Sequence, residues 1–523
     1  MVDAGSQRTQ QVFTAGNFIN YTYDAIGQLK TAQGWEADGT TPRLHEQFGY
    51  AYDKAWNLNQ RTNNALVQTF NVNSLNELTT TTNKGTLTVA GTTTEPGANV
   101  SSVTVNSLTA AVYGDGAFAR TNFTIANGNN TFTAVAHDSI GVGRWSTNSV
   151  TVNLPATNSY TYDLNGNLLS DGTRHFGFDD ENQLVSVWVA NTWSNSYAYD
   201  GLLRKRIERD YSWNAGTSGW LLTNEVRYVY DGQLVVQERD ANNVPLVTYT
   251  RGNDLSGTLQ DAGGIGGLLA RTDNGQMIAG NPAAHAYYFS DGNGNVTMLV
   301  NTNGTILAQY AYDPFGNTLW MSGPLATANT YRFSSKEWND HAGLYYYGRR
   351  FYDPLLQRWP NRDPLEEDGG INLYEFVKNS PISWFDSDGA APMSCSDITQ
   401  AINNNNQSGL DPDIIKCIAY RESGFDPSAL NKRSSATGLM QMTDGATTDA
   451  GGEPSMMGNA GYNIYYGSKY VGMRVRQAHG NITKGLDGYG TGPGYGKAIQ
   501  DCADCLKKKG NCNGDCLKKA KGQ

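Results

Sequence analysis

A short unit of two tyrosines in alternate positions followed by aspartate recurs along the first 313 residues of the sequence. Side chains alternate between the two faces of a strand, so both rings of a unit fall on one face. The aspartate and the Gly or Asn residues behind it supply a tight turn into the next strand, and each unit therefore predicts a hairpin. One hairpin cannot bury its aromatic face, so the units must stack into a continuous sheet. They begin at Tyr21, Tyr50, Tyr160, Tyr197, Tyr228 and Tyr310.

Residues 84–155 lack this unit. They consist instead of alternating Thr, Val and Ala with Asn and Gly turns, at 85–89, 101–105, 131–135 and 149–152. Such runs predict a small β-sandwich inserted between two blocks of hairpins. We therefore expect hairpin repeats over 1–83 and 156–330, with the sandwich between them. The 59 glycines, 30 tyrosines and charged fraction of 17% favour many short strands joined by turns over long charged helices.

The hairpin units resemble the YD repeats of the Rhs family over residues 15–83 and 156–390. From Arg332 the sequence (RFSSKEWNDHAGLYYYGRRFYDPLLQRWPNRDP) resembles the Rhs core-associated domain, which we expect over 331–390. The resemblance implies a hollow β-shell around a C-terminal toxin. For repeat aspartates such as Asp24, turn capping is a better explanation than a calcium or sugar site, so we expect them to be scaffold.

The same resemblance implies a self-cleaving protease. In that family two aspartates cut the chain after a closing Asp-Pro-x-Gly-Leu sequence, and by position they fall on Asp363 and Asp386, with cleavage after Ala390. Two carboxylates that share a proton can act as base and acid because their like charges push the two pKa values apart. The sequence departs from the family pattern at Glu366, Ser387 and Ala390, and the alternative is that both aspartates only cap turns.

A second chemical signal lies near the end of the chain. Asp411-Pro412 is a strong helix start, and the predicted helix ends at Ser423-Gly424. Ile415 and Ile418 precede Glu422 at helical spacing, which places this carboxyl group on the buried stripe at the C-terminal end of the helix. Burial and the helix dipole there both favour the neutral form, as a general acid requires. The alternative is a structural glutamate paired with Arg421 or a neighbour.

Four motifs follow in order: ESGFDPSA at 422–429, ATGLMQM at 436–442, NI at 463–464 and YGTGPG at 489–494. Together they resemble the soluble lytic transglycosylase family of the lysozyme-like superfamily over about residues 395–500. The resemblance makes Glu422 the acid that cleaves peptidoglycan and Ser423 a residue that orients it. It implies a strand-like wall at Gly438, Leu439, Met440 and Gln441 that contacts N-acetyl groups, and a hydrogen bond from Tyr489 near Glu422. Gly490 stands where that family usually has Asn.

All six cysteines lie in the predicted C-terminal domain, residues 391–523. An even number in a small domain favours up to three disulfides, with 15 possible pairings. The alternative is a zinc knuckle built from Cys502, Cys505, Cys512 and Cys516. We favour disulfides, and we expect neither a metal nor a cofactor. This domain holds 15 basic and 12 acidic residues, whereas residues 1–390 hold 24 basic and 37 acidic ones. The small positive excess of the C-terminal domain is only weak evidence for an anionic target such as cell wall.

The fold class expected is thus multidomain, a β-rich YD-repeat shell with an inserted β-sandwich followed by a mainly α lysozyme-like domain. The function implied is a secreted Rhs-type polymorphic toxin that cleaves peptidoglycan glycan strands in the periplasm or wall of target bacteria. Its expected partners are those strands, an immunity protein and a secretion machinery, with no nucleic acid and no membrane anchor. Because no signal peptide precedes the first unit, we expect a piece of a longer ancestor or a specialised exporter. The alternative is a surface adhesion protein with a hydrolytic lysozyme or a non-catalytic glycan-binding tail.

Overall fold

The computed structural model describes the chain except residues 2–6, 94–98, 140–142, 256–258, 261, 282–283, 365, 367–371, 391–398, 400–401, 404, 426–428, 430, 432–433, 455–456, 458–459, 491–493, 510–513 and 523. It divides into two compact units. The first comprises Met1–Asp363 and Asn372–Ala390, and the second comprises Pro364–Ile371 and Ala391–Gln523.

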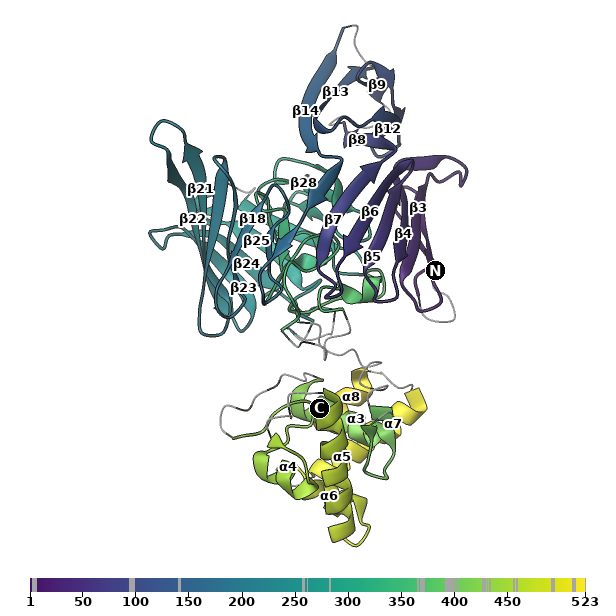
Figure 1. Ribbon diagram of the computed structural model, residues 1–523, viewed down its shortest axis with the longest axis vertical. Coiled ribbons are helices and arrows are strands. Elements are labelled where there is room, and N and C mark those ends of the chain that lie inside the picture. Colours follow the sequence, from purple (N-terminus) through teal and green to yellow (C-terminus); the bar gives the residue numbers. More distant parts are fainter. Residues whose placement is uncertain are drawn as a thin grey trace. The chain divides into compact units, whose positions relative to one another are not determined.

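Two large antiparallel sheets dominate the first unit, and in each the strands follow sequence order as a run of hairpins (Figure 1). The first sheet contains β1 (Gln10–Val12), β2 (Phe18–Tyr23), β3 (Leu29–Trp35), β4 (Pro42–Tyr52), β5 (Leu58–Asn63), β6 (Leu66–Val72), β7 (Leu78–Lys84) and β15 (Thr157–Ser159). The second contains β16 (Thr161–Tyr162), β17 (Leu168–Ser170), β18 (His175–Phe178), β19 (Leu184–Val189), β20 (Trp193–Tyr199), β21 (Lys205–Asn214), β22 (Gly219–Asp231), β23 (Leu234–Arg239), β24 (Pro245–Arg251), β25 (Leu268–Asp273), β26 (His285–Ser290), β27 (Val296–Val300), β28 (Ile306–Tyr312) and β29 (Thr318–Ser322). A short helix, α1 (Asn274–Ile278), joins β25 to β26.

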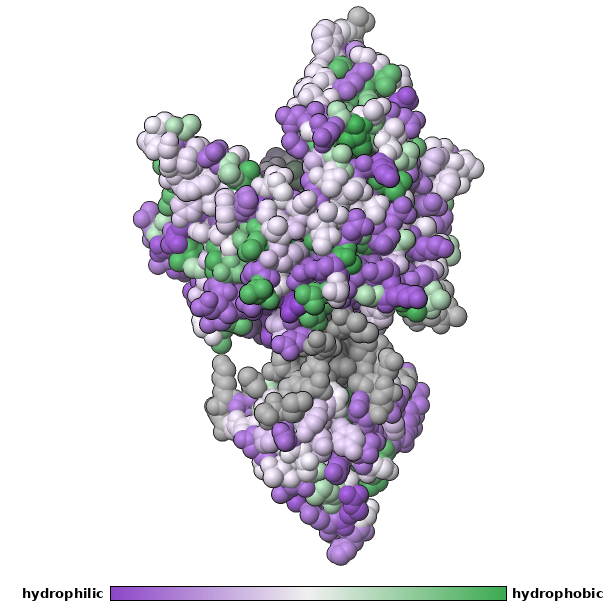
Figure 2. All heavy atoms as spheres, in the orientation of Figure 1, coloured by the Kyte–Doolittle hydropathy of each residue, from purple (hydrophilic) through white to green (hydrophobic). Residues whose placement is uncertain are grey.

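Five of the six repeat aspartates cap turns, as the sequence predicted, whereas Asp231 ends β22 and pairs with Leu234 of β23. Asp24 Oδ1 accepts the backbone N–H groups of Ile26 at 3.0 Å and Gln28 at 2.9 Å. The same double cap recurs at Asp53, Asp163, Asp200 and Asp313. The paired tyrosines share a face, and the rings of Tyr310 and Tyr312 stack with centroids 6.2 Å apart. Hydrophilic and hydrophobic residues mix over the face drawn in Figure 2, as expected for sheets with one buried face and one solvated face.

The inserted β-sandwich is present. One sheet has the strand order β10 (Leu108–Thr109), β9 (Val100–Val105), β13 (Gly128–Asp138) and β14 (Trp145–Leu154). The other has the order β11 (Ala111–Val112), β12 (Ala117–Thr124) and β8 (Thr86–Thr92). Val103, Val105, Phe118 and Phe123 form its buried core, so the alternating Thr/Val pattern does place apolar side chains between two sheets.

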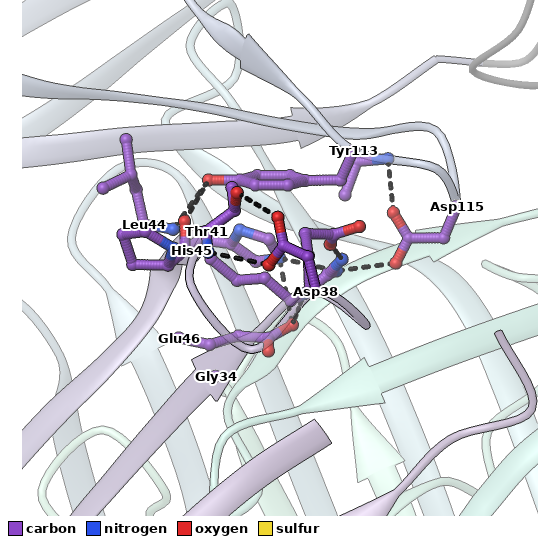
Figure 3. A network of polar contacts seen from close by, with 12 residues as sticks. Gly34, Asp38, Thr41, Leu44, His45, Glu46, Tyr113 and Asp115 are labelled. Carbon is purple, nitrogen blue, oxygen red and sulfur yellow. Dashed lines mark hydrogen bonds and ion pairs between the residues drawn. The ribbon is translucent and has the colours of Figure 1, made fainter. Parts of the chain in front are cut away.

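Figure 3 shows Tyr113 and Asp115 of the sandwich meeting the polar network of Leu44, His45 and Glu46 in β4. Arg43 of the same strand joins the sandwich to the first large sheet. Its guanidinium is nearly fully buried and pairs with Glu36 at 2.5 Å, Glu46 at 3.0 Å and, across the junction, Asp115 at 2.6 Å. Beside it, the Tyr113 hydroxyl accepts the backbone N–H of Leu44 at 2.7 Å. The junction is therefore a buried, charge-compensated contact.

Residues 331–363 and 372–390 pack between the two large sheets and contribute η3 (Phe333–Ser335), β30 (Glu337–Asn339), β31 (Leu344–Tyr346), β32 (Phe351–Tyr352) and η5 (Val377–Asn379). The core they share with both sheets is aromatic, and the rings of Tyr352 and Phe376 stack with centroids 3.8 Å apart. A buried ion pair ties Lys205 of β21 to Glu337 at 2.8 Å. This segment therefore fills the space between the sheets.

The second unit is helical, with α3 (Pro412–Ser423), α4 (Asp444–Ala450), α5 (Ala460–Gln477), α6 (Ile482–Asp487), α7 (Tyr495–Lys509) and α8 (Gly514–Ala520). Its core lies between α3, α5 and α7 and includes Ile415, Ile418, Ile464, Val471 and Ile499, each fully buried or nearly so. The fold class predicted from the sequence, a β-rich shell with a sandwich followed by a mainly α domain, is confirmed.

Candidate active site

Helix α3 places Glu422 as the sequence predicted. Asp411 is the N-cap and accepts the N–H of Asp413 at 2.9 Å, and Pro412 opens the first turn. Ile415 and Ile418 are fully buried. The helix ends at Ser423, because Gly424 adopts the left-handed conformation (φ 70°) that a side chain disfavours.

The Glu422 carboxyl is half-buried and accepts a hydrogen bond from a tyrosine hydroxyl. The Tyr495 hydroxyl donates to Glu422 Oε1 at 2.5 Å. Burial raises the pKa of Glu422 above its ordinary value, and the Tyr495 hydrogen bond and the charge of Arg421 oppose that rise. The net direction is upward, so the carboxyl keeps its proton to a higher pH than a free glutamate.

Arg421 does not make the salt bridge of the structural alternative. Its Nη1 donates to the carbonyl of Ala520 in α8 at 2.6 Å, and its guanidinium lies 4.2 Å from the centre of the Tyr495 ring. Across the part of the chain that the structure describes, Glu422 forms no ion pair. Its neighbour Ser423 donates to the carbonyl of Ala419 at 3.0 Å, within α3.

Tyr489 lies near Glu422, because burial and the charge of Glu422 together raise the pKa of its hydroxyl well above the usual value. Within the described ranges it makes no hydrogen bond to Glu422 itself. Its hydroxyl donates to the carbonyl of Met440 at 2.6 Å. Tyr495, which the sequence reasoning missed, takes the place at the acid. The only signal for it was an aromatic residue at the start of a helix close behind Gly490, and that pattern does not say which side chain the ring will meet.

Residues Gly438 to Gln441 form a tight turn between bridge partners Thr437 and Met442, rather than the expected strand-like wall. Gly438 and Gln441 have φ of 77° and 45°, which an extended strand excludes. Leu439 and Met440 are fully buried in the core, so neither residue faces solvent. The Gln441 amide donates to the carbonyls of Ala429 at 2.9 Å and Gly438 at 3.1 Å.

Two disulfides brace this region. Cys417 of α3 pairs with Cys502 of α7, and Cys505 of α7 pairs with Cys516 of α8. These pairings consume three of the four sulfurs of the zinc alternative. Cys395 and Cys512 lie outside the described residues. Among the residues that are described, no cluster of His, Cys, Asp or Glu suited to a metal occurs.

The predicted protease residues lie together at the end of the first unit. Arg350 Nη2 contacts Asp363 Oδ2 at 2.6 Å, and Arg350 Nε donates to the carbonyl of Gly389. The N–H of Gly389 in turn donates to Asp386 Oδ1 at 2.8 Å. One buried guanidinium, also unforeseen from the sequence, therefore links the first aspartate to the segment that carries the second.

Burial and the nearby negative charge of Asp363 raise the pKa of Asp386, and Arg350 opposes that rise. Asp386 Oδ1 also accepts the N–H of Asp388 at 3.1 Å, so this aspartate caps the turn at 386–389 as well. Ala390 is 4% exposed. Lys336 Nζ donates to the carbonyl of Ser387 at 2.6 Å and holds the same turn from the other side.

Three family models match parts of the chain: Teneurin YD-shell at 146–382, Transglycosylase SLT domain at 400–509 and Glucodextranase, domain B at 70–155. The chain therefore combines a YD-shell with a C-terminal transglycosylase SLT domain, which confirms both resemblances drawn from the sequence. No helix in the described ranges has the length and apolar content needed to cross a membrane.

Among curated relatives, the chain is 30% identical over 240 residues to tRNA3(Ser)-specific nuclease WapA of Bacillus spizizenii, covering 44% of this chain and 9% of the relative. It is 41% identical over 102 residues to toxin subunit YenC1 of Yersinia entomophaga, covering 19% and 10%. The chain thus spans about a tenth of the length of these relatives.

Two solved structures match parts of the chain. TcdB2-TccC3 covers 74% of this chain and 19% of its own, at 17% identity and a TM-score of 0.34. The lytic transglycosylase Slt of Pseudomonas aeruginosa covers 27% of this chain and 22% of its own, at 23% identity and a TM-score of 0.17. With scores this low, the assignment rests on the family models and on the site itself.

Proposed function

We propose that the second unit cleaves the glycosidic bond between N-acetylmuramic acid and N-acetylglucosamine in peptidoglycan, with Glu422 as the catalytic acid. Glu422 protonates the glycosidic oxygen. It then takes the proton of the muramyl C6 hydroxyl, whose oxygen attacks C1 and leaves a 1,6-anhydro end without adding water. The substrate's own N-acetyl group can stabilise the positive centre, so one protein carboxylate suffices.

The observation that carries this proposal is that Glu422, within the matched transglycosylase SLT domain, is half-buried and has a raised pKa. A general acid must be protonated near neutral pH and must reach the substrate. Burial favours the protonated form of Glu422, and the side chain is only half-buried, so it remains within reach of solvent. We keep the substrate-side roles of Ser423, Gly438, Gln441 and Tyr489 as part of this proposal. Leu439 and Met440, which are fully buried, support that side of the site from the core.

The test compares the full chain with Glu422→Gln on purified sacculi, followed by mass spectrometry of the products. Glu453→Gln, a change at an exposed glutamate of the same unit, is the matched control. We expect anhydro-muramyl ends from the wild type and the control and none from Glu422→Gln. Reducing ends would instead indicate a hydrolytic lysozyme, and intact sacculi with bound protein would indicate a non-catalytic glycan-binding tail.

We also propose that the first unit cuts the chain after Ala390. One carboxylate of the Asp363–Asp386 pair takes a proton from water, whose oxygen attacks the carbonyl carbon of Ala390. The other, protonated, gives its proton to the departing amide nitrogen. The shared Arg350 contact, the raised pKa of Asp386 and the burial of the 389–390 segment support this assignment.

Self-cleavage predicts two bands on a denaturing gel, for residues 1–390 and 391–523. Asp386→Asn should leave one full-length band, whereas Asp340→Asn, at an exposed position, should still give two. A single band from the wild type would overturn the proposal. The departures at Glu366, Ser387 and Ala390 then become the first positions to restore to the family pattern.

For the whole protein we propose a secreted toxin that acts in the periplasm or wall of competing bacteria, released from a YD-shell. This role requires an export machinery and an immunity protein in the producer. Expressing the full chain with a periplasmic signal should lyse the host, while cytoplasmic expression should not. A surface adhesion protein would be harmless in both places.

A further inference from the structure

We infer that Tyr495, seated in a space that Gly490 leaves open, is the residue that positions the Glu422 carboxyl in this chain. The inference deepens the proposed glycosidic cleavage and rests on it. It assigns a role to Tyr495, which lies outside the motifs singled out from the sequence, and a steric reason to Gly490 within the last of them.

The first observation is the contact itself. The Tyr495 hydroxyl lies 2.5 Å from Glu422 Oε1, and the tyrosine is 2% exposed. A buried phenol at this distance holds one carboxyl oxygen in a fixed direction. The proton that reaches the glycosidic oxygen is then the one on Oε2, whose orientation the contact at Oε1 determines.

The second observation is how the ring is held. Tyr495 is the first residue of α7, and the guanidinium of Arg421 lies over its face at 4.2 Å. Arg421 is itself fixed by the carbonyl of Ala520. The ring therefore separates the Arg421 charge from the carboxyl, and the acid receives a neutral donor in place of a direct ion pair, which would hold it ionised.

The third observation is the room for the ring. A Cβ atom built on Gly490 would lie 2.0 Å from Cε2 and 2.1 Å from Cδ2 of Tyr495, closer than any two such atoms can approach. The backbone of Gly490 does not adopt the left-handed conformation, because this residue is not among the glycines with positive φ. The glycine at this position thus has a steric reason. Any larger residue, including Asn, would push the ring away from Glu422.

The experiment uses the full chain and compares Tyr495→Phe, Gly490→Ala and the control Tyr465→Phe, which removes a hydroxyl from an exposed tyrosine of α5. Tyr495→Phe should lower kcat about 10- to 100-fold, the range for a lost hydrogen bond to a charged group. The donor favours the carboxylate, so its removal raises the pKa of Glu422 further. The alkaline limb of the kcat/KM profile should therefore move to higher pH.

Gly490→Ala should reproduce both effects. Adding it to Tyr495→Ala should cost nothing more, because the ring it would strike is gone. Tyr465→Phe should leave rate and pH profile unchanged. Near-ultraviolet circular dichroism of each variant verifies that the fold is retained.

An infrared titration of the Glu422 carboxyl, taken as the difference from Glu422→Gln, reads the contact without turnover. Wild-type rate, pH profile and carboxyl titration in Tyr495→Phe would overturn the inference, even though Glu422→Gln remained inactive and the proposed function stood. If the wild type cleaves no peptidoglycan, the proposed function fails. The infrared comparison then still decides whether Tyr495 holds the carboxyl.

Discussion

Removing the Cys417–Cys502 disulfide should destabilise the second unit more than removing Cys505–Cys516, although both join neighbouring helices. The first closes a loop of 85 residues and the second a loop of 11. In the chain-entropy treatment, these loops contribute about 4.6 and about 2.8 kcal/mol at 25 °C. For a domain of about 130 residues, the corresponding falls in Tm are roughly 17 and roughly 10 °C.

The two units of the chain can be followed separately. All 11 tryptophans lie within residues 1–390, and all six cysteines lie beyond them. Circular dichroism at 222 nm is dominated by the helical second unit, while tryptophan fluorescence reports only on the first. Thermal melts of the two double Cys→Ala variants, and of the wild type with and without reductant, should shift the transition followed at 222 nm. The transition followed by tryptophan fluorescence should stay unchanged.

An equal loss of stability from the two double variants, or a larger loss from the 11-residue loop, would refute the loop-entropy reasoning. A fluorescence transition that shifts with reductant would show that the stabilities of the two units are linked. Because Cys417 and Glu422 share α3, and Cys502 and Tyr495 share α7, the same reduction should also lower glycan cleavage.

Three further predictions concern single side chains. Arg43→Met leaves the carboxylates around it, including Asp115, uncompensated and should cost about 3–5 kcal/mol in denaturant melts followed by tryptophan fluorescence; an unchanged midpoint would contradict this. Burial raises the pKa of Glu375 to about 8, so its stabilising effect is complete below the unfolded value of 4.5 and is lost as pH rises through 8. Glu375→Gln should therefore flatten the fall in fluorescence-detected stability between these pH values, and an unaltered slope would count against it. Asp411→Ala removes the N-cap of α3 and should lower the free energy of unfolding by about 1 kcal/mol in melts at 222 nm. An unchanged free energy of unfolding would contradict this prediction.

Local chemistry explains why so much of the fold could be predicted from the sequence. Tyrosine alternation fixes which face of a strand is apolar, and an aspartate such as Asp24 carries its own turn cap, so each hairpin is specified within a few residues. The same holds for α3, whose start at Asp411-Pro412 and end at Gly424 are both encoded locally.

The sequence did not specify the contacts that join distant parts of the chain. Tyr489 and Tyr495 are both aromatic residues near the start of α7, and only the packing of α7 against α3 decides which hydroxyl meets Glu422. The pairing of Cys417 with Cys502 is likewise one of 15 arrangements that spacing cannot separate. Arg350 gave no motif signal because its role depends on the approach of Asp363 and Gly389 from separate turns.

The two steps of the proposed reaction place opposite demands on Glu422. It must hold a proton when the bond to the leaving sugar breaks, and it must be an anion able to take one when the C6 hydroxyl attacks. Burial alone would favour the acid and make the anion costly, whereas a direct ion pair with Arg421 would favour the anion and lose the acid. The observed arrangement lies between these extremes, because a neutral phenol meets the carboxyl and the guanidinium stays behind the ring. Replacing Tyr495 should therefore impair the step that needs the anion more than the step that needs the acid, and anhydro ends should fall relative to reducing ends as water competes with the C6 hydroxyl.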